Sequence, residues 1–175
     1  DIFFQGVNLA HSGLDQRKAH VIAREAALKM KISPLTDKKK NKIKPIAVHH
    51  HLILGLQKPS VWPVPKEQMQ ELWSSMKMSK SIPDSAIFIT DSPEEIKRKM
   101  NKSFCPEKEI EFNPVLDWCK SLIFRDNKSK LEIKRPEKFG GNKDYDNYQS
   151  LEGDFVSGSL HPADLKNAVA EKLIL

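Results

Sequence analysis

Three helix start signals, each containing a proline, constrain what the second half of this sequence can form. Ser92-Pro93, followed by Glu95, combines an N-cap residue, a first-turn proline and an acid in the capping-box position. Asn113-Pro114 and His161-Pro162 repeat the signal. Proline is favoured in the first helical turn and disrupts helix interiors, so each pair marks a beginning. Residues 91–175 are therefore predicted to be mostly helical.

Apolar side chains recur after each start at three- and four-residue spacing, which places them on one face of a helix. Each of the three helices is therefore predicted to bury one face in a core. The residues of these faces are Ile96 and Met100, then Val115, Trp118, Cys119 and Leu122, then Leu165, Ala168, Val169 and Leu173.

Residues 1–90 are expected to mix helix, strand and long loops. The spacing predicts a helix over residues 16–30, with Asp15 as its N-cap. Its apolar face would be Ala19, Ile22, Ala23, Ala26 and Met30. The apolar run 45–48 predicts a buried strand, and residues 68–75 a short helix. We place a domain boundary near residue 91.

The positive charge of this 175-residue chain lies in one stretch. Its formal net charge is +6, and residues 29–58 carry eight basic residues and one acidic residue while the rest nearly balances. The centre of the stretch is the run Lys38 to Lys44. Such a run attracts nucleic-acid phosphates, or it forms a solvated, mobile surface loop. Charge by itself leaves both interpretations open.

Several protein classes are excluded by composition. No stretch approaches 18 consecutive apolar residues, so a transmembrane helix is not expected. Cys105 and Cys119 alone cannot form a disulfide framework or a four-cysteine zinc site, and they indicate reduced thiols in a cytosolic protein. The first residues contain neither Met nor the pattern of a signal peptide, and the chain reads as one that starts inside a fold.

The sharpest chemical signal is the segment Lys77-Met78-Ser79-Lys80-Ser81. Two lysines three residues apart, with hydroxyl side chains beside them, can place two ammonium groups against one polyphosphate. Phosphoryl or adenylyl transfer needs such positive charge where negative charge develops. The alternative is a basic surface loop built from common residues.

This segment reads KMSKS and resembles the second signature of the class I aminoacyl-tRNA synthetases. Residues 82–96 (IPDSAIFITDSPEEI) are similar to the segment that follows it in the tyrosine and tryptophan enzymes. Residues 12–25 (SGLDQRKAHVIARE) resemble the tyrosine-pocket helix of archaeal-type tyrosyl-tRNA synthetases. Residues 134–141 (KRPEKFGG) and 161–171 (HPADLKNAVAE) resemble the anticodon-binding region of the same family.

The resemblance implies an α/β fold in which the C-terminal part of a Rossmann-type catalytic domain precedes an α-helical anticodon-binding domain. Residues 1–90 would form the former, with the KMSKS loop at 76–82, and residues 91–175 the latter. The family's HIGH-type motif is not found, and His49-His50-His51 does not match it. The chain therefore resembles the C-terminal half of the enzyme and is expected to be inactive alone.

The family is a group of ligases that activate tyrosine with ATP, in the presence of Mg²⁺, and transfer it to tRNA(Tyr). The resemblance implies a cytoplasmic homodimer without membrane association for the full-length protein. Two alternatives remain open. One is the related tryptophanyl-tRNA synthetase, which shares the KMSKS segment, and the other is a non-catalytic tRNA-binding protein that retains only this half.

Residue roles in catalysis also follow from the resemblance. Asp1 would accept a hydrogen bond from the tyrosine hydroxyl, and Gln16 would contact the amino-acid moiety. Lys77 and Lys80 would stabilise the leaving pyrophosphate, and residues 77–81 as a whole would bind ATP. One of the histidines 49–51 would approach adenosine, or all three pack or face solvent; their spacing supplies no metal site.

Four residues are expected to touch RNA. Arg17 would face the first base pair of the acceptor stem, and Phe139, His161 and Asp164 the first anticodon base. An aromatic ring can stack on an unpaired base, and a carboxylate can accept from guanine. His161 and Asp164 are equally a good helix start with an acid in the first turn, and both roles can hold together. The lysine run matches no family contact and is interpreted as a solvated insertion.

Overall fold

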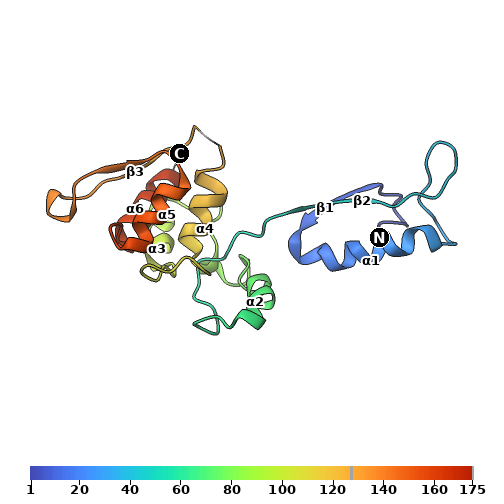
Figure 1. Cartoon of the computed structure of the whole chain (residues 1–175), viewed down its shortest axis with the longest axis horizontal. Helices are drawn as coiled ribbons and strands as arrows, with labels where there is room; N and C mark the ends of the chain where they lie inside the picture. The colour runs from blue at the N-terminus through green and yellow to red at the C-terminus, as the bar shows by residue number, and fades with distance from the viewer. Residues whose placement is uncertain (127, 175) are drawn as a thin grey trace. The chain divides into compact units, whose positions relative to one another are not determined.

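A computed structural model describes residues 1–126 and 128–174, apart from the side chain of Gln70. Its packing divides the chain into two compact units, Asp1–Leu52 and Ile53–Leu175, which are described separately (Figure 1). Within the described residues no helix is both long and apolar enough to cross a membrane.

The first unit is a strand–helix–strand motif. Strand β1 (Leu9–Gly13) runs parallel to β2 (Ile46–His50), and Leu9 lies opposite Ile46. Helix α1 (Arg17–Ala26) connects them and packs on β2 (Figure 1). Parallel neighbours require such a crossover, usually a helix, and this unit is typical of α/β proteins. The α/β class expected from the sequence is confirmed.

The helix predicted over residues 16–30 is shorter than expected. Regular α-helix covers only α1, with 3-10 turns at Leu14–Gln16 and Ala27–Lys29, so Asp15 lies within a turn and is not the N-cap. The predicted apolar face is only partly correct: Ala23 and Ala26 are half-buried, whereas Ile22 is 65% exposed. The face toward β2 carries His20 instead, whose Nδ1 lies 3.0 Å from Nε2 of His49.

Strand β2 is not the buried strand that its apolar run predicts. Ile46 and Val48 are 57% and 45% exposed, while Ala47 and His49 are half-buried. Successive side chains of a strand point to opposite faces, and α1 covers only the face that carries His49. The apolar side chains of the other face are therefore exposed in this unit.

The lysine run lies on a hydrogen-bonded turn. Thr36 and Lys42 pair as a short antiparallel bridge, and the Asp37 carboxylate accepts hydrogen bonds from the N–H groups of Lys39 and Asn41, both at 2.8 Å. The same bonds lower the pKa of Asp37, the largest effect coming from the Asn41 side chain. Lys38, Lys39 and Lys40 are exposed, whereas the Lys42 ammonium donates to the Met30 carbonyl at 2.6 Å.

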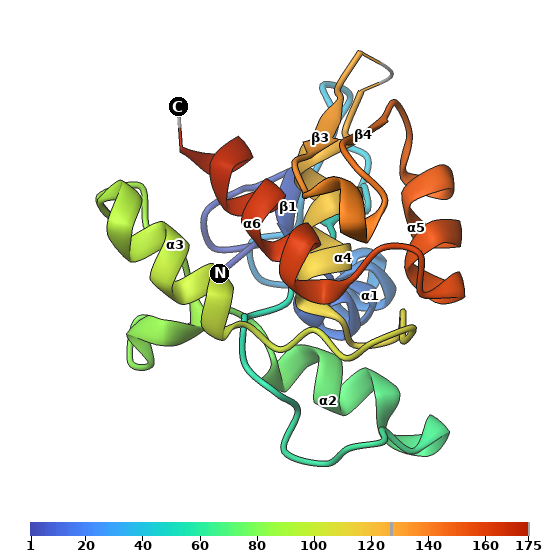
Figure 2. The ribbon, with the colours of Figure 1, turned by 90° about the vertical axis from the view of Figure 1, so that its left-hand side faces the viewer.

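The second unit is mainly helical, as predicted for residues 91–175, but also contains a β-hairpin. Its elements are α2 (Met69–Ser75), α3 (Pro93–Lys102), α4 (Pro114–Trp118), β3 (Leu131–Ile133), β4 (Lys143–Tyr145), α5 (Tyr148–Ser157) and α6 (Pro162–Leu173). Helix α6 packs against α3, α4 and β3, and Figure 2 shows β3 and β4 side by side. The hairpin and α5 were not predicted from the sequence, whereas α2 confirms the short helix near residues 68–75.

All three helix start signals are confirmed, each capped by the side chain that precedes the proline. Only half of the expected capping box forms, because the Glu95 carboxylate binds Arg98. The cap bonds run to Ser92 Oγ from the N–H of Glu95 (3.3 Å), to Asn113 Oδ1 from Val115 and Leu116 (3.1 and 3.3 Å), and to His161 Nδ1 from Ala163 (3.1 Å).

The predicted core faces of these helices are largely confirmed. Leu173 is half-buried against the core, and Leu122 is 40% exposed. The reason for the exposure of Leu122 is that α4 continues as a π-helical turn, Cys119–Ile123, whose wider spacing rotates the following residues. Ile123, 6% exposed, occupies the core instead. The buried members are Ile96, Met100, Val115, Trp118, Cys119, Leu165, Ala168 and Val169.

The second unit begins well before residue 91 because residues 53–56 are bonded to α4. The Leu54 N–H donates to the Asp117 carboxylate at 2.9 Å, and Trp118 Nε1 donates to the Leu54 carbonyl at 2.7 Å. By packing, the chain therefore divides after Leu52. The boundary near residue 91, drawn between a catalytic and a tRNA-binding part, stays a prediction about function.

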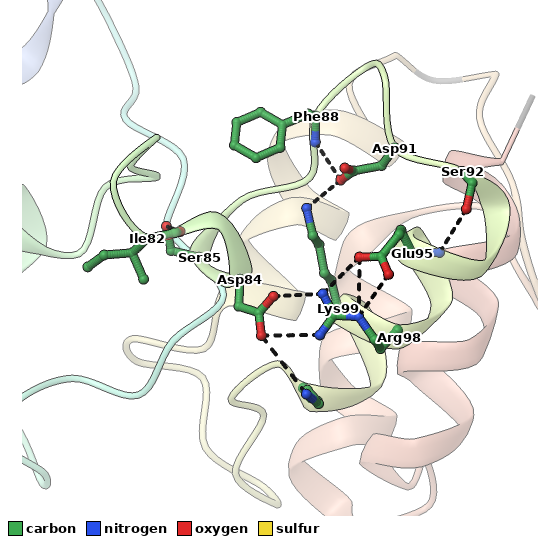
Figure 3. A network of polar contacts seen from close by, with 10 residues as sticks. Ile82, Asp84, Ser85, Phe88, Asp91, Ser92, Glu95, Arg98 and Lys99 are labelled. Carbon is green, nitrogen blue, oxygen red and sulfur yellow. Dashed lines mark hydrogen bonds and ion pairs between the residues drawn. The ribbon is translucent and has the colours of Figure 1, made fainter.

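A buried ion pair holds the loop before α3 (Figure 3). Lys99 Nζ lies 2.6 Å from the Asp91 carboxylate, and the two side chains are 3% and 12% exposed. The same carboxylate accepts from the Phe88 N–H at 2.8 Å, and the ammonium lies 4.7 Å from the centre of the Phe88 ring. The buried carboxylate therefore has two hydrogen-bond donors, and the buried ammonium group has both a counter-charge and an aromatic ring beside it.

We expect Asp91→Asn to lower the free energy of unfolding of this chain by about 3 kcal/mol, because it leaves the buried Lys99 ammonium without its counter-charge. Urea unfolding measures the effect. Asp146→Asn is the matched control, since it breaks an ion pair with Lys130 whose side chains are 67% and 70% exposed. Equal losses in the two variants would contradict the prediction.

The same pair predicts a pH dependence of stability. The hydrogen bond from Lys99 lowers the pKa of Asp91. Its stabilisation is therefore complete above the pKa of an unfolded aspartate, about 3.9, and is lost as the pH falls through the lower folded value. The stability difference between the wild type and Asp91→Asn should shrink below about pH 4.

Candidate functional site

The KMSKS segment lies between α2 and a 3-10 turn at Pro83–Ser85, in the second unit. Lys77 at its beginning pairs with Leu54 in a short antiparallel bridge, and Ser79 pairs with Ile82. The Ile82 N–H donates to the Ser79 carbonyl at 3.2 Å, which closes the segment into a tight turn.

A buried hydroxyl group holds the middle of this turn. Ser85 is 4% exposed, and its Oγ accepts a hydrogen bond from the Ser79 N–H at 3.0 Å and donates to the Ile82 carbonyl at 2.7 Å. The Oγ of Ser79 in turn accepts from the Ser81 N–H at 3.3 Å. The backbone of the segment is therefore bonded from inside the unit.

Residues 54–56 hold both ends of the segment. The Gly55 N–H donates to the Met76 carbonyl at 2.5 Å, and the Leu56 N–H donates to the Ser85 carbonyl at 2.9 Å. A Cβ atom on Gly55 would lie 2.8 Å from the Met76 carbonyl oxygen and 3.2 Å from that of Ser85. Only glycine allows the three backbone segments to approach so closely.

The side chains of the segment divide between anchoring and exposure. Ser79 is half-buried, whereas Lys77, Met78, Lys80 and Ser81 are exposed. Two cationic side chains are therefore presented to solvent from a backbone that is fixed at Ser79. Such an arrangement can meet a polyanion without reorganising its backbone.

The predicted tyrosine-binding residues lie in the first unit. Asp1 is exposed, and its carbonyl accepts from the Gln5 N–H at 2.9 Å. Gln16 is exposed at the end of a 3-10 turn, where its amide donates to Asp15 at 3.4 Å, and Arg17 is the first residue of α1. Their roles toward tyrosine and tRNA stay predictions.

The two histidines at the end of β2 pair with two histidines that were not singled out from the sequence. His49 lies against His20, and His50 Nδ1 lies 3.1 Å from His11 Nε2. Burial lowers the pKa of His49, and the positive charges of His20 and Arg17 lower it further. In the part of the chain that the structure describes, no group of three His, Cys, Asp or Glu side chains is suited to a metal ion.

Phe139 lies on the connection between β3 and β4. It ends the 3-10 turn Glu137–Phe139, is 60% exposed, and has the Lys138 ammonium 4.9 Å from its ring centre. Arg135, which sequence reasoning missed, donates to the Gly141 carbonyl at 2.9 Å and to the Ser159 carbonyl at 2.7 Å. It thereby brings the Phe139 turn next to the residues that precede α6.

His161 and Asp164 occupy the start of α6, the position that both interpretations of the sequence require. His161 Nδ1 caps the helix, and its Nε2 lies 3.4 Å from the Glu107 carboxylate. Asp164 is half-buried in the first turn. Through Arg135, the loop that carries Phe139 is thus linked to Ser159, two residues before His161.

The two cysteines are poor nucleophiles. Burial raises the pKa of Cys105 to about 11 and raises that of Cys119 further. Both thiols are therefore protonated at neutral pH, and the thiolate is the reactive form.

Comparison with protein families decides the assignment. The family described as "tRNA synthetases class I (W and Y)" matches residues 1–175. The chain belongs to this family. Among relatives of this synthetase chain, the tyrosine–tRNA ligase of Thermococcus kodakarensis is 59% identical over 175 residues, which are 99% of the chain and 46% of that protein.

Solved structures agree with the family assignment. The tyrosyl-tRNA synthetase of Pyrococcus horikoshii, complexed with L-tyrosine, matches with a TM-score of 0.89 at 55% identity, over 99% of this chain and 47% of that one. A tryptophanyl-tRNA synthetase of Giardia lamblia shares the fold, with a TM-score of 0.54 at 22% identity over 95% of this chain and 32% of that one. The synthetase chain spans about half the length of the curated relatives that it matches.

Gly55, Ser85 and Arg135 are the residues of this synthetase chain that sequence reasoning missed. Ser85 and Arg135 lie in segments that resemble the family, but no role followed from the resemblance for any of the three. Each acts on backbone groups of another segment of the chain. The weak signal available was the isolated glycine between apolar residues at 53–56, which often marks a close backbone approach.

Gly55→Ala should destabilise the second unit by about 1–3 kcal/mol, because its Cβ has no room beside the Met76 and Ser85 carbonyls. Gly153→Ala in α5 is the matched control: its Cβ meets nothing within 4 Å, and it should stabilise by about 0.5–1 kcal/mol. Urea unfolding of both variants tests the opposite signs, and a stabilised Gly55→Ala protein would contradict the geometry.

Proposed function

We propose that this chain is part of a tyrosine–tRNA ligase, which activates tyrosine with ATP and transfers it to tRNA(Tyr). The proposal rests mainly on the KMSKS segment, whose backbone is bonded to Gly55 and Ser85 while its two lysines are exposed. The 59% identity to a ligase of that name supports tyrosine as the amino acid. The residue roles below are part of the proposal.

In the first step an oxygen of the tyrosine carboxylate attacks the α-phosphorus of ATP. The new O–P bond forms, the bond between the α-phosphorus and the bridging oxygen breaks, and pyrophosphate leaves with its negative charge. Lys77 and Lys80 stabilise that charge, together with the hydroxyl and N–H groups of residues 77–81. In the second step a hydroxyl of the tRNA 3′ end attacks the tyrosyl carbonyl carbon, and AMP leaves.

No covalent protein intermediate is needed in either step. Catalysis then depends on positioning and electrostatics, and the buried, protonated thiols of Cys105 and Cys119 have no part in it. Asp1 and Gln16 would select tyrosine. Asp1 is exposed in this chain, and its selectivity would depend on the pocket of the intact enzyme enclosing it. Phenylalanine leaves an enclosed acceptor of the phenol hydroxyl unsatisfied, a difference that can discriminate by about 10⁴–10⁵-fold.

Mg²⁺ belongs to the proposal only as a partner of ATP. The KMSKS segment offers ammonium and hydroxyl groups and no carboxylate, whereas Mg²⁺ prefers oxygen ligands that include carboxylates. These residues do not fit a protein-bound Mg²⁺ site, and no step above depends on one.

We assign tRNA binding to Arg17 on the first unit and to Phe139, His161 and Asp164 on the second. Exposed Phe139 offers a stacking surface, and Asp164 offers an acceptor for guanine at the first anticodon position. A cytoplasmic homodimer as the state of the full-length enzyme follows from the family resemblance.

In the intact enzyme that contains this chain, Lys80→Ala should slow tyrosine-dependent ATP–pyrophosphate exchange by at least about 10²-fold, the scale of losing one charge stabiliser. Lys172→Ala, at an exposed position of α6, is the control and should leave the rate unchanged. An unchanged rate in Lys80→Ala would refute the role of this lysine. Exchange with tryptophan instead of tyrosine would favour the alternative specificity.

Asp164→Asn should reduce charging of tRNA with G at the first anticodon position about tenfold, because an amide NH₂ replaces one accepting oxygen of the carboxylate. Charging of tRNA with A at that position should change less. Since Asp164 also favours the α6 N-terminus, the thermal midpoint of each variant is measured in parallel. A wild-type preference retained in Asp164→Asn would contradict the assignment.

A further inference from the structure

The turn that follows the KMSKS segment carries a second set of contacts, which the proposed chemistry does not use. Ser85 bonds the Ser79 backbone from inside the unit, and the neighbouring residue, Asp84, faces α3. The two contacts emerge from consecutive residues of one 3-10 turn, Pro83–Ser85. That turn therefore connects the backbone of the KMSKS segment to α3.

Arg98 of α3 binds Asp84 through two parallel hydrogen bonds (Figure 3). Its Nη1 and Nη2 donate to the two oxygens of Asp84 at 3.1 and 2.7 Å. Glu95, one turn earlier, accepts from Nε and Nη2 of the same guanidinium, at 3.2 and 2.8 Å, and fixes its plane. The hydrogen bonds from Arg98 lower the pKa of Asp84, so its carboxylate stays ionised.

This ion pair is expected to contribute little to stability. The side chains of Arg98 and Asp84 are 37% and 48% exposed, and ion pairs so exposed contribute little to the free energy of unfolding. Bidentate geometry, however, fixes direction as well as distance. The pair is thus suited to orienting the Pro83–Ser85 turn on α3, and the buried Lys99–Asp91 pair of the same helix supplies the stability.

We propose that Ser85, together with Asp84 held by Arg98, positions the backbone at Ser79 and thereby sets where Lys80 points. The inference rests on the proposed function. The Lys80 side chain is exposed and follows Ser79 directly, so the path of the backbone at Ser79 decides where its ammonium group can reach. A misplacement of about 1 Å can cost about 10²-fold in a reaction that depends on positioning.

The anchor is tested first on this 175-residue chain, without any assay of activity. Hydrogen–deuterium exchange followed by mass spectrometry should show at least about tenfold faster exchange in residues 77–82 of Ser85→Ala, because the Ser79 N–H loses its acceptor. Ser157→Ala removes an exposed hydroxyl of α5 and should leave this segment unchanged. Unchanged exchange of residues 77–82 in Ser85→Ala would overturn the inference.

The consequence is tested in the intact enzyme that contains this chain. Ser85→Ala and Arg98→Met should each lower kcat of tyrosine-dependent pyrophosphate exchange about tenfold, with KM for tyrosine unchanged, because the lysines act on ATP. Arg98→Lys keeps the positive charge but cannot make two parallel hydrogen bonds to Asp84, and it should retain a higher kcat than Arg98→Met. Lys97→Met, the neighbouring exposed position of α3, is the control and should keep wild-type kcat.

A purely structural role gives a different pattern. It would lower the unfolding midpoint and the fraction of active enzyme, with kcat per active site unchanged, and that result would overturn the inference while leaving the proposed function intact. Wild-type enzyme without tyrosine-dependent exchange would instead refute the proposed function, and the positioning role with it. The exchange measurement on the chain would then still report whether Ser85 holds the turn.

Discussion

Both backbone polar groups of Leu54 are bonded to side chains of α4, and the second unit depends on this contact. Asp117 accepts from the Leu54 N–H, and Trp118 donates to its carbonyl. Leu54 is 1% exposed, so leaving either group without a partner would be costly. Residues 54–56 in turn bond Met76, Lys77 and Ser85, and the KMSKS segment is therefore attached to the helical core through one short stretch of backbone.

The charged side chains of this molecule have different roles according to how deeply they are buried. The Lys99–Asp91 pair is nearly buried and contributes stability. The Arg98–Asp84 pair is half exposed, and its proposed role is to orient the Pro83–Ser85 turn on α3. Lys77 and Lys80, the proposed partners of ATP, are exposed. The lysine turn after Asp37, which holds much of the net charge, is ordered by carboxylate hydrogen bonds and belongs to the first unit.

Local signals predicted where α3, α4 and α6 begin, but not α5. A capping side chain followed by proline acts within one helical turn, so Ser92, Asn113 and His161 could be recognised without knowledge of the fold. The KMSKS segment was likewise readable as contiguous sequence. Leu122 was wrongly assigned to the core because residue spacing does not indicate a π-helical turn. Ile22 was wrongly assigned because the face of α1 that packs on β2 is the one that carries His20.

The sequence by itself determined the family, the starts of three helices and the positions of the two candidate catalytic lysines, because each is encoded in a short contiguous pattern. Only the tertiary structure decided that Gly55 and Ser85 hold the KMSKS backbone, that Arg98 grips Asp84, and that Arg135 brings Phe139 next to the start of α6. These contacts join groups whose separation along the chain varies from a few residues to more than twenty. Hydrogen bonds of this kind depend on where folding brings the backbone, and no local pattern of residues specifies that.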